Sequence, residues 1–252
     1  MKKYTLNKKS YYALGILFIF GLWAIISFFF DENGLIFPSF PSVFKETINI
    51  LKGSYIYECL YQTLIRMIKG FLIALLIAII LGTISGRSTS FKYFINPLIV
   101  VLKTIPIATL VFFFLVLSGA KDTPIYIVVL LSFPILYESV VAGYENIDKT
   151  LNDMLKLDMG NELEKTISVR FPLVLPYLLV GIASSLGLSF KTEIMAEILT
   201  GSTKNGLGSM ISYVQKTDPT NMTMIFAYSL IAIAISLIFD LILKLIKNRA
   251  EI

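Results

Sequence analysis

The sequence contains no histidine and a single cysteine, Cys59, among its 252 residues. One cysteine excludes an intramolecular disulfide, and the absence of histidine removes the commonest metal ligand and general base. Charged residues are scarce, at 15%, whereas 56% of the residues are hydrophobic and the mean hydropathy is +0.78. Because soluble domains do not have this composition, we expect an all-α, polytopic membrane protein with no metal site and no cofactor.

Six apolar segments are long enough to cross a bilayer as helices, which takes about 20 residues each. They cover residues 11–30, 63–86, 95–118, 124–143, 172–199 and 222–245. The third is expected to be broken at Pro97 and Pro106, and a short loop, 120–123, is expected to join it to the fourth. The first is expected to be retained, because its apolar run exceeds that of a signal peptide. In the second, Gly82, Ser85 and Gly86 form a small-residue patch that favours close approach of another helix.

A short interfacial helix is expected between the first two spans. The segment FPSFPS favours extended backbone before it, and Ser42 is the predicted cap. Its predicted buried face consists of Phe44, Ile48 and Leu51. We therefore divide the chain into a leader with the first span, 1–40, and a core domain, 41–252, that holds the other five spans.

One long polar segment, 144–172, interrupts the apolar sequence, and it reads YENIDKTLNDMLKLDMGNELEKTISVRFP. Apolar residues recur in it at every fourth position and predict one face of a helical segment. They are Leu151, Leu155, Met159, Leu163 and Ile167. Gly160 interrupts this pattern and Asn161 is a suitable cap, so we expect two short helices joined by a turn. The alternative is an amphipathic connector lying on the membrane surface.

The basic residues indicate which side of the membrane this loop occupies, because short cytoplasmic loops carry an excess of Lys and Arg. The loops on its side contain thirteen: Lys2, Lys3, Lys8, Lys9, Arg87, Lys92, Lys149, Lys156, Lys165, Arg170, Lys244, Lys247 and Arg249. The opposite side has five: Lys45, Lys52, Lys121, Lys204 and Lys216. Arg66 and Lys69 are expected to snorkel from the outer end of their span and raise the five to seven. The loop and both termini are therefore predicted to be cytoplasmic.

The spacing of the loop resembles the cytoplasmic loop of permease subunits of ATP-binding-cassette (ABC) importers. That pattern is Glu-Ala-Ala, three residues, Gly, nine residues, Ile-x-Leu-Pro, and anchoring it on Pro172 places Met159 at the glycine position. Gly160 follows one residue later and is expected to provide the turn. The resemblance marks as coupling-loop residues Leu151, Asp153, Met154, Leu155, Met159, Gly160, Val169, Phe171 and Pro172.

Further motifs follow in the order of that family along residues 40–245. The segment TLIRMIKGF resembles the start of the family core, and LPYLLVG with a later Ala-Glu resembles its fifth span. The FPSFPS segment is similar to one in the nitrate, sulfonate, taurine and bicarbonate branch. The residues that carry these matches are Thr63, Leu64, Arg66, Gly70, Phe71, Leu175, Pro176, Gly181, Ala196 and Glu197.

The resemblance implies a MetI-like permease fold in the cell membrane and a subunit that is not itself an enzyme. It implies two ABC ATPase subunits on the cytoplasmic loops, an extracytoplasmic solute-binding protein and a second permease copy. The branch implies a small anion such as nitrate, a sulfonate, taurine or bicarbonate, or a thiamine-precursor pyrimidine. The net charge of +5 reflects where the lysines lie, so no nucleic-acid partner is expected.

Charged and helix-breaking residues inside the spans are the candidates for the translocation pathway or its gate, because such residues are costly in lipid. They are Lys103, Pro106, Glu138, Lys191, Glu193 and Glu197. For Lys103 the alternative is a structural role against carbonyls freed by proline. A self-contained secondary transporter or channel is the alternative function and predicts an internal repeat, which is not found. A membrane enzyme is disfavoured because Glu193 and Glu197 are the only closely spaced carboxylates within a span.

Overall fold

The computed structural model describes residues 8–30, 36–157, 160–201 and 205–250, and in this part of the chain the elements are helical. The elements are α1 Lys8–Phe30, α2 Phe40–Lys52, α3 Tyr55–Arg87, α4 Thr89–Thr104, α5 Ile107–Glu145, α6 Lys149–Leu157, α7 Glu162–Lys165, η1 Thr166–Arg170, α8 Phe171–Thr200, α9 Leu207–Thr217 and α10 Met222–Ala250. The prediction of an all-α protein is confirmed.

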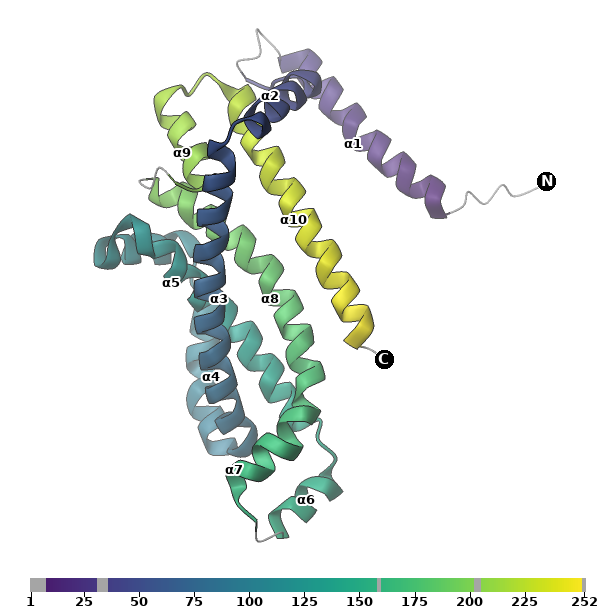
Figure 1. Cartoon of the computed structure of the whole chain (residues 1–252), viewed down its shortest axis with the longest axis vertical. Helices are drawn as coiled ribbons and strands as arrows, with labels where there is room; N and C mark the ends of the chain where they lie inside the picture. Colours follow the sequence, from purple (N-terminus) through teal and green to yellow (C-terminus); the bar gives the residue numbers. More distant parts are fainter. Residues whose placement is uncertain (1–7, 31–35, 158–159, 202–204, 251–252) are drawn as a thin grey trace, which may run out of the picture.

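The bundle has two ends, which we name by the short helices that they carry. Figure 1 shows α3 running from the end with α2 and α9, the α9 end, to the end with α6 and α7, the loop end. After Gly119, α5 runs from the α9 end to the loop end, and α8 runs back to the α9 end. Five described helices are long and apolar enough to cross a membrane: Ser10–Phe30, Tyr55–Arg87, Ile107–Glu145, Glu162–Thr200 and Met222–Leu241.

The third predicted span, 95–118, is interrupted at Pro106 as expected, but not at Pro97, which lies inside α4. Five described helices, not six, are long enough to cross a membrane, because the return from the loop end to the α9 end is divided between α4 and the start of α5, where Leu110 and Val111 pack against Ala196. The chain breaks between α4 and α5, where Ile105 and Pro106 are extended. Pro106 has no N–H for a helical bond and pushes its preceding residue out of helical geometry. The residues between the third and fourth predicted spans, 120–123, are helical, and the chain turns instead at a kink at Gly119, whose φ of 74° suits glycine.

The interfacial helix exists as α2, but its predicted cap and buried face are wrong. It begins at Phe40 after Ser39, and the buried side chains on it are Val43 and Thr47. Phe44, Ile48 and Leu51 are 51%, 39% and 37% exposed. The apolar positions in this helix therefore turn toward the surroundings, as on a helix that meets lipid.

The core lies where α3, α5 and α8 pack together. Small residues allow α3 to approach α5 closely: a Cβ atom at Gly82 would lie 2.7 Å from the Cβ of Val140. The ring of Tyr144 occupies the corresponding space beside Gly86. The Tyr137 hydroxyl donates a hydrogen bond of 2.8 Å to Ser85 Oγ. The small-residue patch predicted at residues 82–86 is therefore a helix-packing surface.

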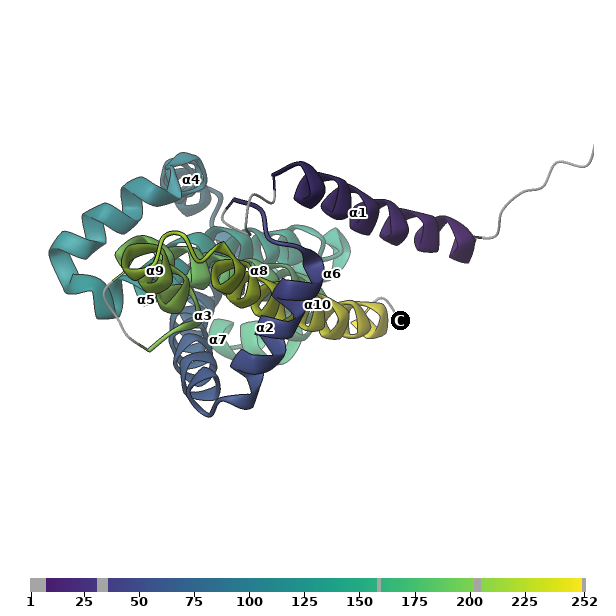
Figure 2. The same ribbon diagram turned by 90° about the horizontal axis from the view of Figure 1, so that it is seen from above.

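Helix α1 lies apart from this core in both views (Figures 1 and 2). Its described contacts are near its C-terminal end, where Trp23 Nε1 donates to the Pro38 carbonyl at 3.1 Å. The same indole ring packs near Phe37, Phe40 and Phe226. An aromatic group thus attaches α1 to α2 and α10, while most of α1 stays exposed on the isolated chain.

We predict that Gly82→Val lowers thermal stability, because the added side chain must displace Val140 in a packed interface. Overpacking of this kind costs about 1–3 kcal/mol. Gly21→Val in α1 is the matched control, because nothing lies within 4 Å of a Cβ atom there. The measurement is thermal aggregation of the detergent-solubilised protein. Equal aggregation temperatures for both variants would contradict this account of the interface.

Candidate functional site

The polar loop, residues 144–172, contains the short helix α6 and ends in α7, η1 and the start of α8, at the loop end of the bundle (Figure 1). Asp148 precedes α6 and accepts hydrogen bonds from the backbone N–H groups of Thr150 and Leu151 at 2.8 and 3.1 Å. The Leu151 N–H and the bonds from Thr150 hold the pKa of Asp148 below its usual value. The ionised carboxylate is therefore the N-terminal cap of α6.

The short helix α6 was correctly predicted, but the second predicted helix is not separate, because α7 and η1 continue into α8 as one helix, Glu162–Thr200. The predicted apolar stripe does not lie on one surface, since Leu163 and Ile167 are 63% and 60% exposed whereas its first residues turn inward. Leu155 is only 9% exposed, and Leu151 packs against the core of the bundle. Met154 and Leu157 are instead 64% and 84% exposed. Within α6 the positions spaced by four turn inward, because this helix needs apolar contacts to stay on the bundle. The outward apolar surface of α6 is therefore formed by Met154 and Leu157.

The second helix of the loop is held against the first by a buried lysine. Asn161 caps α7 by accepting from the Leu163 N–H at 2.9 Å, as its position after Gly160 predicts. Lys165 is 6% exposed, and its Nζ donates to the Leu155 carbonyl at 2.8 Å. That carbonyl lies near the C-terminal end of α6, so the positive charge of Lys165 also interacts favourably with the negative end of the helix dipole.

Glu162 joins the loop to the end of α3. Its Oε2 lies 2.7 Å from Arg87 Nη2 and 3.1 Å from Arg170 Nη1, and its Oε1 lies 2.9 Å from Lys165 Nζ. One carboxylate thus connects α7 to the last residue of α3 and to η1, which leads into α8. Lys92 of α4 forms a further ion pair with Glu145 at the end of α5. Arg87 and Lys92, from the junction of α3 and α4, therefore lie at the same end of the bundle as Lys165 and Arg170 of the polar loop.

The remaining predicted coupling residues lie around these helices. Asp153, Gly160 and Pro172 are exposed, Val169 is half-buried, and Phe171 is half-buried against the core. Met159 lies outside the described residues. The loop therefore presents an exposed surface on α6 and a set of inward residues that seat it on the bundle.

A second group of charged residues is buried near the α9 end, and we name it the buried charge cluster: Thr63, Arg66, Glu193 and Glu197. Arg66 Nε donates to Glu193 Oε1 at 3.2 Å, and Arg66 Nη2 donates to Glu197 Oε1. Both glutamates are 0% exposed and Arg66 is 8% exposed. The expectation that Arg66 snorkels to the surface is therefore wrong, because two carboxylates on α8 retain it in the interior, whereas Lys69 is exposed as expected.

The other charged candidates within the spans form two partly exposed ion pairs. Lys103 Nζ of α4 lies 2.8 Å from Glu138 Oε1 of α5, next to the chain break at Pro106. Lys191 of α8 lies 3.9 Å from Asp240 Oδ2 of α10. The side chains of both pairs are about half exposed on the isolated chain.

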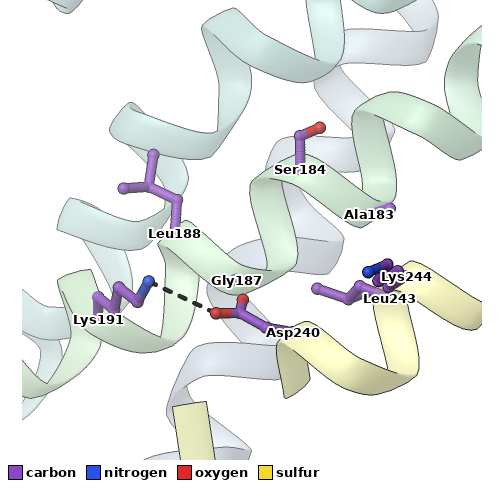
Figure 3. A pocket seen from close by; sticks show the side chains of 8 residues that line it. All are labelled: Ala183, Ser184, Gly187, Leu188, Lys191, Asp240, Leu243 and Lys244. Carbon is purple, nitrogen blue, oxygen red and sulfur yellow. Dashed lines mark ion pairs between the residues drawn. The ribbon is translucent and has the colours of Figure 1, made fainter. Parts of the chain in front are cut away.

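The Lys191–Asp240 pair lies in a groove between α8 and α10 with a volume of about 390 Å³ (Figure 3). Gly187 leaves room for the Asp240 carboxylate, which reaches across to α8: a Cβ atom at Gly187 would lie 3.1 Å from Asp240 Oδ1. The groove is lined by Ala183, Ser184, Gly187, Leu188, Lys191, Asp240, Leu243 and Lys244. A charged pair exposed at this depth is unfavourable against lipid, so this groove is expected to face water or another protein chain.

Sequence reasoning missed several residues on which these sites depend. Asp240 is a single charge near the end of the last span, and only an expected partner for Lys191 would have pointed to it. Glu162 was one of many charges in the polar loop. Its convergence with Arg87 and Arg170 requires the ends of α3 and α8 to be adjacent, which no local pattern shows.

The geometry defines a class: a helical, multi-pass membrane protein with a polar helical loop at one end and charged groups between its spans. Residues 70–252 match the family described as the inner membrane component of binding-protein-dependent transport systems. The chain belongs to this family of ABC transporter permeases, and it is a transport subunit, not an enzyme.

Individual relatives agree with this assignment. The chain is 24% identical over 242 residues to a probable ABC transporter permease protein of Brucella melitensis, covering 94% of this chain and 89% of the relative. It is 21% identical to the putative aliphatic sulfonates transport permease protein SsuC of Bacillus subtilis, over 92% and 83% of the two chains. It is 25% identical to the nitrate import permease protein NrtB of Leptolyngbya laminosa, over 82% and 76%.

Solved structures share the fold. An amino acid ABC transporter superposes with a TM-score of 0.64 and 15% identity, covering 81% of this chain and 98% of the other. The MetNI methionine ABC transporter in an inward-facing conformation gives a TM-score of 0.61 and 14% identity, covering 78% and 94%. The predicted MetI-like permease fold is confirmed.

We predict that Lys165→Met loosens α6, because it removes the donor to the Leu155 carbonyl and leaves Glu162 with fewer partners. Leaving a buried polar group unpaired costs about 1–3 kcal/mol. Chymotrypsin cleavage after Leu157, followed in membrane vesicles, should become several-fold faster. Lys149→Met at an exposed position of the same helix is the control. Cleavage of both variants at the unmodified rate would show that Lys165 does not hold the helix in place.

Proposed function

We propose that the chain forms the translocation pathway of an ABC importer for a small anion and couples it to ATP hydrolysis by a separate ATPase subunit. The observation that carries this proposal is the polar loop, a folded helix pair with an exposed apolar surface, joined by Glu162 to the end of α3. The exposed Met154 and Leu157 support a protein partner. The alternative, in which these side chains insert into the membrane surface, predicts that their substitution leaves ATPase binding unchanged.

The proposed assembly contains two copies of this chain, two ATPase subunits on the polar loops and an extracytoplasmic solute-binding protein. The family description names a binding-protein-dependent system, which supports the last of these partners. One copy offers one loop, and ATPases of this type act in pairs. The distribution of Lys and Arg supports placing the loop end and both termini in the cytoplasm. The leader with the first span, 1–40, and the core, 41–252, are the proposed domains.

The solute class is proposed from the relatives and from the groove between α8 and α10. Two of the relatives are named as permeases for nitrate and for aliphatic sulfonates, which are anions. Lys191 and Lys244 against Asp240 give this groove an excess of positive charge. We place Lys103, Pro106, Glu138 and Lys191 along the pathway. Glu193 and Glu197 are enclosed by protein, and we place them at its gate.

We predict that Met154→Glu combined with Leu157→Glu uncouples the transporter, because it places two charges where the apolar surface of α6 meets the ATPase. Full burial of a large apolar side chain contributes about 1.5–3 kcal/mol. ATPase subunits should co-purify poorly and solute uptake should fall, while the protein still inserts into membranes. The controls are Met154→Leu and Leu157→Met, which keep the apolar area.

The measurement is uptake and ATP hydrolysis in the same reconstituted vesicles. If the double glutamate variant retains both, and their ratio, at unmodified values, α6 is not the coupling element. Leu155→Glu is the less specific test that the sequence suggests, because that side chain is buried within the chain and its loss would disturb the loop itself.

We further predict that position 191 is reached from water. Lys191→Cys should react with a membrane-impermeant thiol reagent in vesicles, whereas Phe190→Cys, whose side chain is 0% exposed, should not. Lys191→Gln should reduce uptake of nitrate or taurine more than it reduces ATP hydrolysis. Reaction at 191 only with reagents confined to the lipid phase would remove this residue from the pathway.

A further inference from the structure

The buried charge cluster contains two carboxyl groups and one guanidinium, and all three lie on spanning helices. Both glutamates are fully enclosed, so neither obtains solvation from water. An uncompensated charge in such surroundings is strongly unfavourable. The cluster is neutral only if one of the two glutamates holds a proton.

The two carboxyl groups have different surroundings. Glu197 accepts from Thr63 Oγ1 at 2.9 Å, from Arg66 Nη2 and from the Gly208 N–H at 2.8 Å. Glu193 accepts one bond, from Arg66 Nε through Oε1, and its Oε2 has no partner among the described residues. Hydrogen bonds to both oxygens favour the charged form, so the surroundings of Glu197 suit a carboxylate and those of Glu193 suit a neutral acid.

The same groups hold the main chain at the start of α9, residues 205–208, which we name the outer segment. Arg66 Nη2 donates to the Asn205 carbonyl at 2.7 Å. The Leu207 N–H donates to Thr63 Oγ1 at 2.9 Å, and the Gly208 N–H donates to Glu197. Thr63 thus accepts a hydrogen bond from the outer segment and donates one to Glu197.

We propose that Thr63, Arg66 and Glu197 are positioning residues that fasten the outer segment across the α9 end, and that Glu193 holds the proton that keeps this latch neutral. The segment approaches the cluster closely enough to require glycine at two positions. A Cβ atom at Gly206 would lie 2.6 Å from both Arg66 Nη2 and Glu197 Oε1, and one at Gly208 would lie 2.3 Å from the Ile194 carbonyl. The Gly-Leu-Gly sequence is therefore explained by the latch. The inference does not depend on the proposed transport function.

The native cysteine provides a reporter of the latch. Cys59 lies one helical turn before Thr63 on the same face of α3 and is 0% exposed. The backbone of Gly206 lies within hydrogen-bonding range of its sulfur. Release of the outer segment is therefore expected to open Cys59 to water.

The first test is the rate at which a water-soluble maleimide labels Cys59 of the full chain in membrane vesicles. Glu197→Gln should increase this rate about tenfold or more, because it leaves the Arg66 charge unpaired and weakens two contacts to the outer segment. Glu193→Gln keeps the shape of the side chain and replaces a protonated, neutral carboxyl group by a neutral amide. The labelling rate of Cys59 in this variant should therefore stay close to that of the unmodified chain. Equal effects of the two variants, or no effect of Glu197→Gln, would overturn the proposal.

The second test uses charge balance and remains decisive if a single variant folds poorly. Arg66→Gln should lower the aggregation temperature, and adding Glu197→Gln should recover part of the loss, because no unpaired charge remains. Adding Glu193→Gln to Arg66→Gln should recover nothing, since Glu197 stays ionised without its partner. If the aggregation temperature recovers when Glu193→Gln, and not Glu197→Gln, is added to Arg66→Gln, the proton is on Glu197. If neither addition raises the aggregation temperature, the cluster is not a neutral latch.

Discussion

Close contact between α3, α5 and α8 is the constraint on which the rest of the structure depends. Apolar side chains alone do not drive helices together within a membrane, because lipid is equally apolar, so packing of small residues and interhelical polar contacts must do it. Gly70 and Gly82 place α3 directly against α5, and Gly181 places α8 against Ser139 of α5. Only at this separation does the Arg66 side chain reach the carboxylates of α8. The buried charge cluster thus follows from helix packing.

The spans that the sequence predicted well are those in which a single local rule operates. Long apolar runs predicted α1, α3, α8 and α10, and the small residues at 82–86 predicted a packing surface. The third span was predicted only in part: Pro106 interrupts it as expected, whereas Pro97 lies inside α4. Hydropathy favours one segment through 95–118, whereas the missing N–H of Pro106 ends α4 and Gly119 redirects α5. Hydropathy measures the cost of exposure to water and carries no information on where a helix bends.

The candidate sites were predicted in position but not in orientation. The helix α6 and the cap at Asn161 were predicted, although the helix that begins after Asn161 continues into α8. The spacing of Leu151 and Leu155 did not reveal whether their face meets a partner or the chain's own core. An amphipathic helix has the same pattern in both cases. Similarly, Arg66 was predicted to snorkel because it lies near one end of the predicted span 63–86. Its true surroundings depend on Glu193 and Glu197, more than 120 residues away along the chain.

Helix α3 carries one arginine, Arg66, about a third of the way along it and another, Arg87, at its last residue. Each pairs with the polypeptide that forms α7 and α8. Arg66 pairs with Glu193 and Glu197 near the α9 end, and Arg87 pairs with Glu162 at the loop end. The two arginines are separated by 21 residues. At a rise of 1.5 Å per residue, this corresponds to about 30 Å of helix. A helix attached to the same neighbour at two such distant points cannot slide along it without breaking one of the two ion pairs. The two arginines therefore tie α3 to the helix that contains α7 and α8 at both places, and Arg66 also connects this attachment to the outer segment through the Asn205 carbonyl.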